Sequence, residues 1–178
     1  LYAAQAFASL SAYLNLQDAV WKERKVLDFG CGTGLLSEKL SPHVGEIYAV
    51  DTSKKMIEVL GRKNLPNVTA VVADIGDLEV AAAATWFAGF DLIVASSVCS
   101  FLSDYEAAVG ILSRTLLPHG YFAQWDWQSS GGENFGLTKD RIRGALEAGD
   151  LKNVDVEIVF SMESETEALP VLMGIGSR

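Results

Sequence analysis

Short runs of β-branched and aromatic residues alternate along the chain with segments whose apolar residues recur every three or four positions. Runs of the first kind predict strands, and the longer periodic segments predict helices. The alternation is typical of an α/β domain with a largely parallel sheet, and the closeness of the last two strands predicts an antiparallel hairpin. The predicted strands are Lys25–Phe29, Glu46–Val50, Asn67–Val72, Phe90–Ala95, Tyr121–Trp125, Val154–Phe160 and Pro170–Ile175.

Helices are predicted between most of these strands and before the first one. Three of them begin at side chains that commonly cap helix N-termini, namely Ser53, Asp104 and Thr138. In the helix after Ser53, the spacing of Met56, Ile57 and Leu60 indicates that all three face inward. The predicted helices are Ala4–Leu14, Leu35–Leu40, the segment from Ser53 past Leu60, Leu78–Phe87, Asp104–Leu116 and the segment from Thr138 to about Leu151. The residues of Pro118–Gly120 predict a turn, and the polar, glycine-rich run Gln128–Leu137 predicts a loop.

The length of 178 residues suits one compact domain, and we expect a single domain over residues 1–178. Within it, residues 1–22 are expected to form an N-terminal helical cap and residues 25–178 the α/β core. Because the chain begins at Leu1 and not at a methionine, we expect the natural protein to begin further upstream.

Charge and cysteine content narrow the possible partners. The 14 basic and 23 acidic side chains give a net charge of −9, which argues against nucleic acid because binding it requires lysines and arginines to neutralise phosphates. Cys31 and Cys99 cannot form a disulfide framework or a zinc site by themselves, so we expect no metal and a reduced, cytoplasmic setting. No stretch reaches the roughly 18 apolar residues of a membrane span, so no membrane partner is expected.

Three alternating glycines follow the first predicted strand, in the run Val26-Leu-Asp-Phe-Gly-Cys-Gly-Thr-Gly34. A strand, a glycine-rich turn and a helix present bare backbone to a cofactor at the carboxyl edge of an α/β sheet. Glycine is required there because a Cβ would block the close approach or forbid the backbone angles of the turn. The spacing departs from the G-x-G-x-x-G pattern of dinucleotide-binding proteins, whose third glycine position is occupied here by Leu35.

Two carboxylates follow the next two predicted strands. Asp51 stands 17 residues after Gly34, at the end of the second strand. An ionised carboxylate there can accept both hydroxyls of a ribose, because it offers two acceptor oxygens. Asp74, just after the third strand, is placed to accept the exocyclic amino group of adenine. The glycines with Asp51 and Asp74 would lie on three adjacent strand ends, which favours a cofactor site over a purely structural turn.

In these motifs the sequence resembles the class I S-adenosylmethionine-dependent methyltransferase family. The resemblance runs from about Val26 to Ile175 and rests on four segments together: Leu27–Gly34, Val50–Ile57, Val72–Asp74 and Phe90–Ser96. It implies a three-layer, doubly wound, mostly parallel seven-stranded sheet in the strand order 3-2-1-4-5-7-6, with the seventh strand antiparallel. It also implies S-adenosylmethionine as methyl donor, S-adenosylhomocysteine as product and in-line displacement. We expect a small-molecule acceptor, because the chain is acidic and carries no appended recognition domain, and a monomer or homodimer.

The cofactor contacts of the family carry over residue by residue. Asp28 would help to hold the amino group of the cofactor, Asp51 the ribose, and Asp74 with the backbone of Ile75 the adenine edge. The glycine run would line the methionine and ribose part, Thr52 and Met56 would flank the adenosine, and the main chain of Ser96 would face the methionine end. The implied cofactor-binding residues are Asp28, Gly30, Cys31, Gly32, Gly34, Asp51, Thr52, Met56, Asp74, Ile75 and Ser96.

The acceptor side is less defined, and no catalytic residue is assigned. Trp125 and Trp127 are candidates for the wall of a substrate pocket; in the alternative, Trp125 packs in the core and Trp127 covers the following loop. Asp126 between them is the best-placed candidate for a general base, with a surface acid as the alternative. His43 and His119 precede strands, so both are expected at the opposite edge of the sheet.

Two other classes of function stay open. An NAD(P)-dependent reductase would share the fold, but it would need glycine where Leu35 stands. A non-catalytic, methyltransferase-like binding or regulatory module would keep the fold and lose the cofactor site, and the retained Asp51 and Asp74 argue against it. Binding of S-adenosylmethionine, S-adenosylhomocysteine and NADH would separate the three classes.

Overall fold

The computed structural model describes residues 1–74, 77, 87–129, 135–163 and 168–178. The described residues form one seven-stranded sheet in the order β3-β2-β1-β4-β5-β7-β6. Neighbouring strands from β3 through β2, β1 and β4 to β5 pair in parallel. Strand β7 pairs antiparallel with both β5 and β6. The predicted α/β class, strand order and antiparallel seventh strand are confirmed. The strands are β1 Lys25–Phe29, β2 Glu46–Asp51, β3 Val68–Val72, β4 Phe90–Ser96, β5 Leu116–Trp127, β6 Lys152–Glu163 and β7 Ala168–Ser177.

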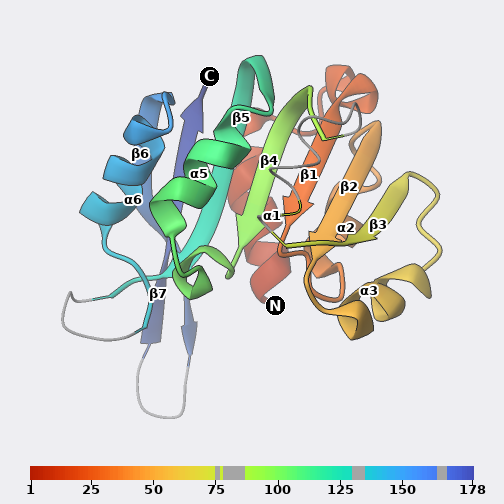
Figure 1. Cartoon of the computed structure of the whole chain (residues 1–178), viewed down its shortest axis with the longest axis horizontal. Coiled ribbons are helices and arrows are strands. Elements are labelled where there is room, and N and C mark those ends of the chain that lie inside the picture. The colour runs from red at the N-terminus through yellow and green to blue at the C-terminus, as the bar shows by residue number, and fades with distance from the viewer. Residues whose placement is uncertain (75–76, 78–86, 130–134, 164–167) are drawn as a thin grey trace.

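Helices cover both faces of the sheet and complete the three layers (Figure 1). In that view, α5 and α6 cross the near face, and α1 lies behind the strands. The three predicted caps form, because the side chains of Ser53, Asp104 and Thr138 each accept a hydrogen bond from the amide three residues on. The helices are α1 Tyr2–Leu14, α2 Leu35–Leu40, α3 Lys54–Gly61, α5 Tyr105–Ser113 and α6 Lys139–Ala148, with short 3-10 helices at Ala19–Glu23 and Cys99–Phe101.

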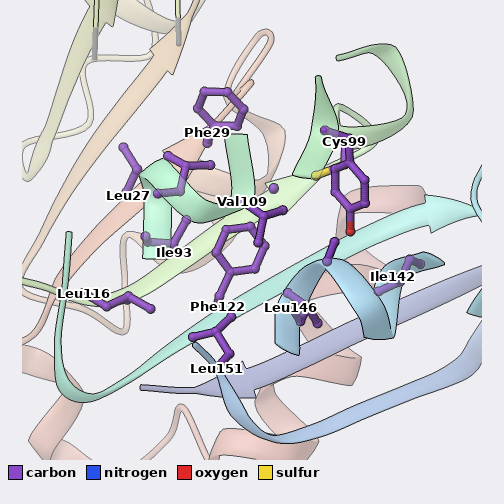
Figure 2. Close-up of a cluster of buried hydrophobic side chains, with 14 of the residues drawn as sticks. Leu27, Phe29, Ile93, Cys99, Val109, Leu116, Phe122, Ile142, Leu146 and Leu151 are labelled. Carbon is purple, nitrogen blue, oxygen red and sulfur yellow. The ribbon is translucent and has the colours of Figure 1, made fainter. Parts of the chain in front are cut away.

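Two hydrophobic cores, one on each face, hold the strands in place. Under α5 and α6, residues of the central strands such as Leu27, Ile93 and Phe122 pack against Val109 and Leu146 (Figure 2). On the other face, α1, α2 and α3 pack on the sheet through a second buried cluster whose members include Leu10, Leu36, Leu40 and Leu60. Burial of apolar side chains on both faces explains why the parallel strands read as nearly continuous hydrophobic runs.

The observed elements differ from the predicted ones at the start of β5 and at Met56. Helix α5 ends at Ser113, and β5 begins at Leu116, so the predicted turn Pro118–Gly120 lies within a strand. The pairing register of β4 with β5 shifts there, and His119 adopts a left-handed φ of 67°, so the turn-forming residues make a bulge. Met56 is 42% exposed and does not face inward. The helix predicted over 78–87 lies outside the described residues, except for Phe87.

Candidate functional site

A cavity of about 430 Å³ opens at the carboxyl edge of the parallel strands. It is formed by the ends of β1, β2 and β4, by the turns that follow them, and by the first turn of α1. A second cavity of about 270 Å³ adjoins it, and Gly30, Asp51, Val98 and Phe101 line both. The predicted cofactor residues in the first cavity are Asp28, Gly30, Cys31, Gly32, Asp51, Met56 and Ser96, and those in the second include Thr52 and Asp74.

The glycine turn is built from three left-handed residues, with φ of 68° at Gly30, 54° at Gly32 and 73° at Gly34. A Cβ on Gly30 would lie 2.4 Å from the side chain of Val98, and one on Gly34 would lie 2.3 Å from Leu60. Gly34 lines neither cavity; it begins α2 and allows Leu60 of α3 to pack against it. The first two glycines shape the cavity, and the third fixes the helix behind it.

Asp51 connects the glycine turn to the start of α3. One oxygen of its carboxylate accepts a hydrogen bond from the Gly32 amide (2.9 Å), and the other accepts one from the Ser53 amide (2.8 Å). A carboxylate has about four acceptor positions, so these two bonds leave capacity for hydroxyl donors in the cavity. The same side chain therefore orders the turn and offers acceptors to a ligand.

Asp28 lies at the bottom of the larger cavity and is only 1% exposed. Burial raises the pKa of its carboxyl to about 6, and the hydrogen bond that Ser37 Oγ donates at 2.5 Å opposes this shift. At neutral pH a carboxylate in this position provides a negative charge where the resemblance places an amino group.

Asp74 is exposed at the rim of the smaller cavity. Its carboxylate accepts a hydrogen bond from the Asp77 amide at 2.9 Å, and the Asp77 carboxylate accepts one from the Asp74 amide at 3.2 Å. The lining between Asp74 and Asp51 is largely apolar and includes Phe29 and Val50. An apolar slot with acids at its ends suits a flat base attached to a sugar. Ile75, predicted to act through its backbone, lies outside the described residues.

The far end of the larger cavity is formed by the N-terminal helix and by the segment after β4. Tyr2 and Ala3 of α1, Ser97, Val98 and Phe101 line it. Ser97 has a left-handed φ of 54°, and its amide donates to the Trp125 carbonyl, so the chain turns sharply after β4. The apolar periodicity of α1 could have suggested burial of its inner face, but it carries no signal for contact between α1 and the end of β4.

The aromatic residues at the end of β5 have different roles. Trp125 is completely buried and donates its indole N–H to Ser9 Oγ of α1 at 2.9 Å, so the prediction that it walls a pocket is wrong. Trp127 lies at the edge, with its ring 5.5 Å from that of Tyr2 and 6.1 Å from that of Phe135. The core alternative for Trp125 is correct because this face of β5 is covered by α1.

Asp126 is fully buried, so the alternative that it is a surface acid is wrong. It accepts hydrogen bonds from the Ser100 amide (3.1 Å) and from Gln124 Nε2 (2.9 Å), and Tyr105 donates to Gln124 Oε1 at 2.7 Å. Burial raises the pKa of Asp126 to about 7, against the effect of these donors. The side chain lines neither cavity. Through its hydrogen bond with the Ser100 amide, Asp126 stabilises the segment that follows β4.

The remaining candidates lie away from the two cavities. Cys99 is packed in the core. The ring of His43 lies 5.1 Å from that of Phe7, and His119 lines a cavity at the amino ends of the strands, so both histidines are at the opposite edge. Among the described residues, no group of histidines, cysteines and acids is arranged to hold a metal ion. No helix in the described part of the chain is long and apolar enough to cross a membrane.

Comparison with known proteins identifies the family. A family model described as a methyltransferase domain matches residues 27–124. An uncharacterized methyltransferase of Schizosaccharomyces pombe is 32% identical over 108 residues, which cover 56% of this chain and 38% of that protein. Malonyl-[acyl-carrier protein] O-methyltransferase of Halalkalibacterium halodurans is 37% identical over 111 residues, which cover 58% of this chain and 39% of that protein. The matches thus span about two fifths of these two relatives.

A solved structure shows the same fold. Magnesium protoporphyrin IX methyltransferase of Synechocystis, with bound S-adenosylmethionine, superposes with a TM-score of 0.69 at 17% identity, over 97% of this chain and 79% of that one. The family expected from the glycine turn and the two strand-end acids is therefore confirmed. The chain belongs to the S-adenosylmethionine-dependent methyltransferases of class I.

Proposed function

We propose that the protein is an S-adenosylmethionine-dependent methyltransferase that methylates a small molecule. The observation that carries this proposal is the position of Asp51 at the junction of two adjoining cavities, where its carboxylate is fixed by the Gly32 and Ser53 amides. A ribose requires hydroxyl acceptors at such a junction, with the base on one side and the amino acid part on the other.

The lining also fits the charge of this cofactor. The described residues around the two cavities include Asp28, Asp51 and Asp74 but no lysine, arginine or histidine. A sulfonium cation with an amino group is favoured by carboxylates, whereas the diphosphate of a dinucleotide would require cations or free amides. The charge of the lining therefore supports the methyltransferase over the reductase.

Each part of the cofactor has residues to hold it. Asp51 would accept the ribose hydroxyls, and Asp28 would hold the amino group, directly or through water. Asp74, with the backbone of Ile75, would bind the adenine edge, and Thr52 and Met56 would flank the adenosine. The backbone at Gly30, Cys31 and Gly32 and the main chain of Ser96 would surround the methionine part, and Gly34 would act only by fixing the helix behind the turn. When bound, the cofactor supplies a methyl group on a positively charged sulfur.

The contribution of the chain to the reaction is alignment and exclusion of water. Tyr2, Val98 and Phe101 are apolar or aromatic residues of the lining, and the Val98 side chain packs directly against Gly30 of the glycine turn. Asp126 does not line the cavity, so its position does not support direct proton transfer from an acceptor. An acceptor that loses its proton easily, or an amine that is already neutral, would need no base.

The proposal is tested by titration calorimetry with S-adenosylmethionine, S-adenosylhomocysteine and NADH. We expect the first two to bind and NADH not to bind. Binding of NADH alone would favour the reductase, and no binding of the first two would refute the proposal. Incubation with methyl-labelled cofactor and a metabolite extract then separates an enzyme from a binding module. Label should enter the small-molecule fraction; transfer only to protein or RNA would contradict the proposed acceptor class.

A further inference from the structure

The turn that follows β4 forms a wall shared by the two cavities at the carboxyl edge. Val98 and Phe101 line both cavities, and Leu102 lines the smaller one. The Val98 side chain also packs so closely on Gly30 that a Cβ there would lie 2.4 Å from it. A shift of this turn would therefore change both the smaller cavity and the glycine turn beside it.

This turn has no helix cap of its own. It is a 3-10 helix over Cys99–Phe101, and the residue before it, Val98, has no side-chain acceptor for the amides of the first turn. By contrast, α3, α5 and α6 begin at Ser53, Asp104 and Thr138, whose side chains accept such amides. The turn after β4 thus needs an acceptor from elsewhere in the fold.

Asp126 of the neighbouring strand β5 supplies that acceptor. Its carboxylate accepts the Ser100 amide at 3.1 Å, although the two residues are 26 positions apart in the chain. Gln124 Nε2 donates to the other carboxylate oxygen at 2.9 Å, and Tyr105 in turn donates to Gln124 Oε1 at 2.7 Å. The cap of this turn is therefore a buried side chain whose position is fixed by two further residues.

Burial of this carboxylate is costly. Asp126 is fully buried, and the hydrogen-bond partners that the structure describes for it are neutral groups. Burial accordingly raises the pKa of its carboxyl to about 7. A buried charge without a cationic partner lowers stability, and carboxyls shifted in this way concentrate at functional sites. The benefit that offsets the cost lies in what the carboxylate holds in place.

We infer that Asp126 is a positioning residue for the cofactor, which caps the turn after β4 and thereby fixes Val98 and Phe101 as a wall of the adenosine site. It acts through the turn and touches neither the cofactor nor the acceptor. The inference rests on the proposed function, because it requires the adenosine to occupy the smaller cavity. Without the cap, the cofactor would have to order the turn on binding, and its affinity would fall.

The test measures the affinities of S-adenosylhomocysteine and 5′-methylthioadenosine by calorimetry at pH 8, above the pKa of Asp126. The second ligand carries the adenosine but lacks the charged amino acid part. Asp126→Ala should weaken binding of both by about five- to thirtyfold, the range expected for loss of a helix cap. Asp126→Asn keeps an oxygen for the Ser100 amide, so it should bind both within about twofold of the wild type.

Three outcomes would overturn the inference. Unchanged affinities in Asp126→Ala would mean that the cap does not matter for binding. A loss confined to S-adenosylhomocysteine would mean that the charge of Asp126 acts on the amino group of the ligand and not through the turn. Equal losses in the alanine and asparagine variants would likewise assign the effect to the charge.

Asp104→Ala is the matched control. Asp104 caps α5 through the Ala107 amide at 3.1 Å and lines neither cavity, so its loss should leave both affinities unchanged. Failure of the wild type to bind either ligand would refute the proposed function itself. Binding by the wild type without a loss in Asp126→Ala would refute only the inference about Asp126.

Hydrogen exchange of the wild type provides a second test, which does not require the alanine variant to fold. Because coupling between two sites is reciprocal, a ligand that depends on the turn also stabilises it. Saturation with S-adenosylhomocysteine should therefore slow exchange of the Ser100 amide at least about fivefold more than exchange of the Ala107 amide. Exchange at Ser100 that slows no more than exchange at Ala107 would contradict the coupling.

Discussion

Two cavities of similar size lie at opposite edges of the sheet, about 430 Å³ at the carboxyl ends and about 330 Å³ at the amino ends. At the amino edge, Arg24 pairs with Asp91 at 2.7 Å, and Asp91 also accepts the Lys25 amide at 2.9 Å. At the carboxyl edge, Asp51 accepts two amides, but the described lining of the two cavities contains no lysine or arginine to pair with it. Size therefore does not distinguish a ligand site from a structural hollow here, whereas the charge of the lining residues does.

The backbone differs between the two edges as well. The left-handed residues at the amino edge have local structural causes, because Asn15 ends α1 and His119 forms the bulge of β5. At the carboxyl edge, Gly30 has no such cause and instead makes room for Val98, which lines both cavities. At the same edge Ser97, which is not a glycine, has a left-handed φ of 54°, and strained backbone of this kind is typical of functional sites.

The glycine turn should show the largest effect. Alanine at either position would have to adopt a left-handed φ. At Gly30 the added Cβ would also lie 2.4 Å from the Val98 side chain, whereas at Gly32 no atom lies within 4 Å of the added Cβ. We expect a loss of about 2–5 kcal/mol in the free energy of unfolding for the first and about 1 kcal/mol for the second. Urea denaturation measures both, with Gly144→Ala in α6 as a neutral or slightly stabilising control. Equal losses at Gly30 and Gly32 would show that the contact with Val98 is unimportant.

Asp51 and Asp91 give the sharpest comparison between the edges, since both are carboxylates that accept backbone amides. Asp51→Ala should weaken binding of S-adenosylhomocysteine by about 1.5–3 kcal/mol, or roughly 10- to 150-fold, through loss of a charge-assisted acceptor. Asp91→Ala should lower stability and leave that affinity unchanged. Calorimetric titration of the two variants tests this, and a similar loss in both would mean that the ribose site is misplaced.

The buried Asp126 predicts a pH dependence of stability at the carboxyl edge. Its pKa is about 7 in the folded protein and near 3.8 when exposed. Between these values the folded protein keeps a proton that the unfolded chain releases, so stability falls as pH rises through this window and is level above it. From pH 4.5 to 7.5 the wild type should lose on the order of 2 kcal/mol more than Asp126→Asn in urea denaturation. A smaller slope from Asp28 should remain in the variant, and identical slopes in the two proteins would contradict the assignment.

The ion pair at the amino edge should matter least. Arg24 is nearly half exposed, and pairs of this kind contribute about 0.2–1 kcal/mol. Arg24→Gln should therefore lower the free energy of unfolding by no more than about 1 kcal/mol and leave the affinity for S-adenosylhomocysteine unaltered. A marked loss of affinity for S-adenosylhomocysteine would mean that the amino-edge cavity is energetically coupled to the ligand site.

The cofactor half of the site could be predicted from the sequence because its signals are local. The glycine run and the acids follow predicted parallel strands directly, so the α/β pattern alone places them together at the carboxyl edge of the sheet. On the acceptor side, Trp127 could be named from its place after the fifth strand, but the approach of Tyr2 to Trp127 depends on how α1 packs on the sheet. The sequence also predicts the end of α5 too late in the chain. Pro118 and Gly120 indicate a turn, but pairing with the neighbouring strand makes them part of a bulge in β5. The helical spacing of Met56 predicts that it faces the core. The side chain instead lines the larger cavity, which hydrophobic spacing cannot reveal.

Titration of the labelled protein with S-adenosylhomocysteine, followed by amide chemical shifts, tests directly which edge receives the ligand. The proposed site predicts shifts at Gly30 and Gly32, at Ser53 after Asp51, and at Ser97, with no change around Asp91 and His119. Shifts confined to the amino edge, or none at a saturating concentration, would contradict the proposal that this chain binds its cofactor at the carboxyl ends of β1, β2 and β4.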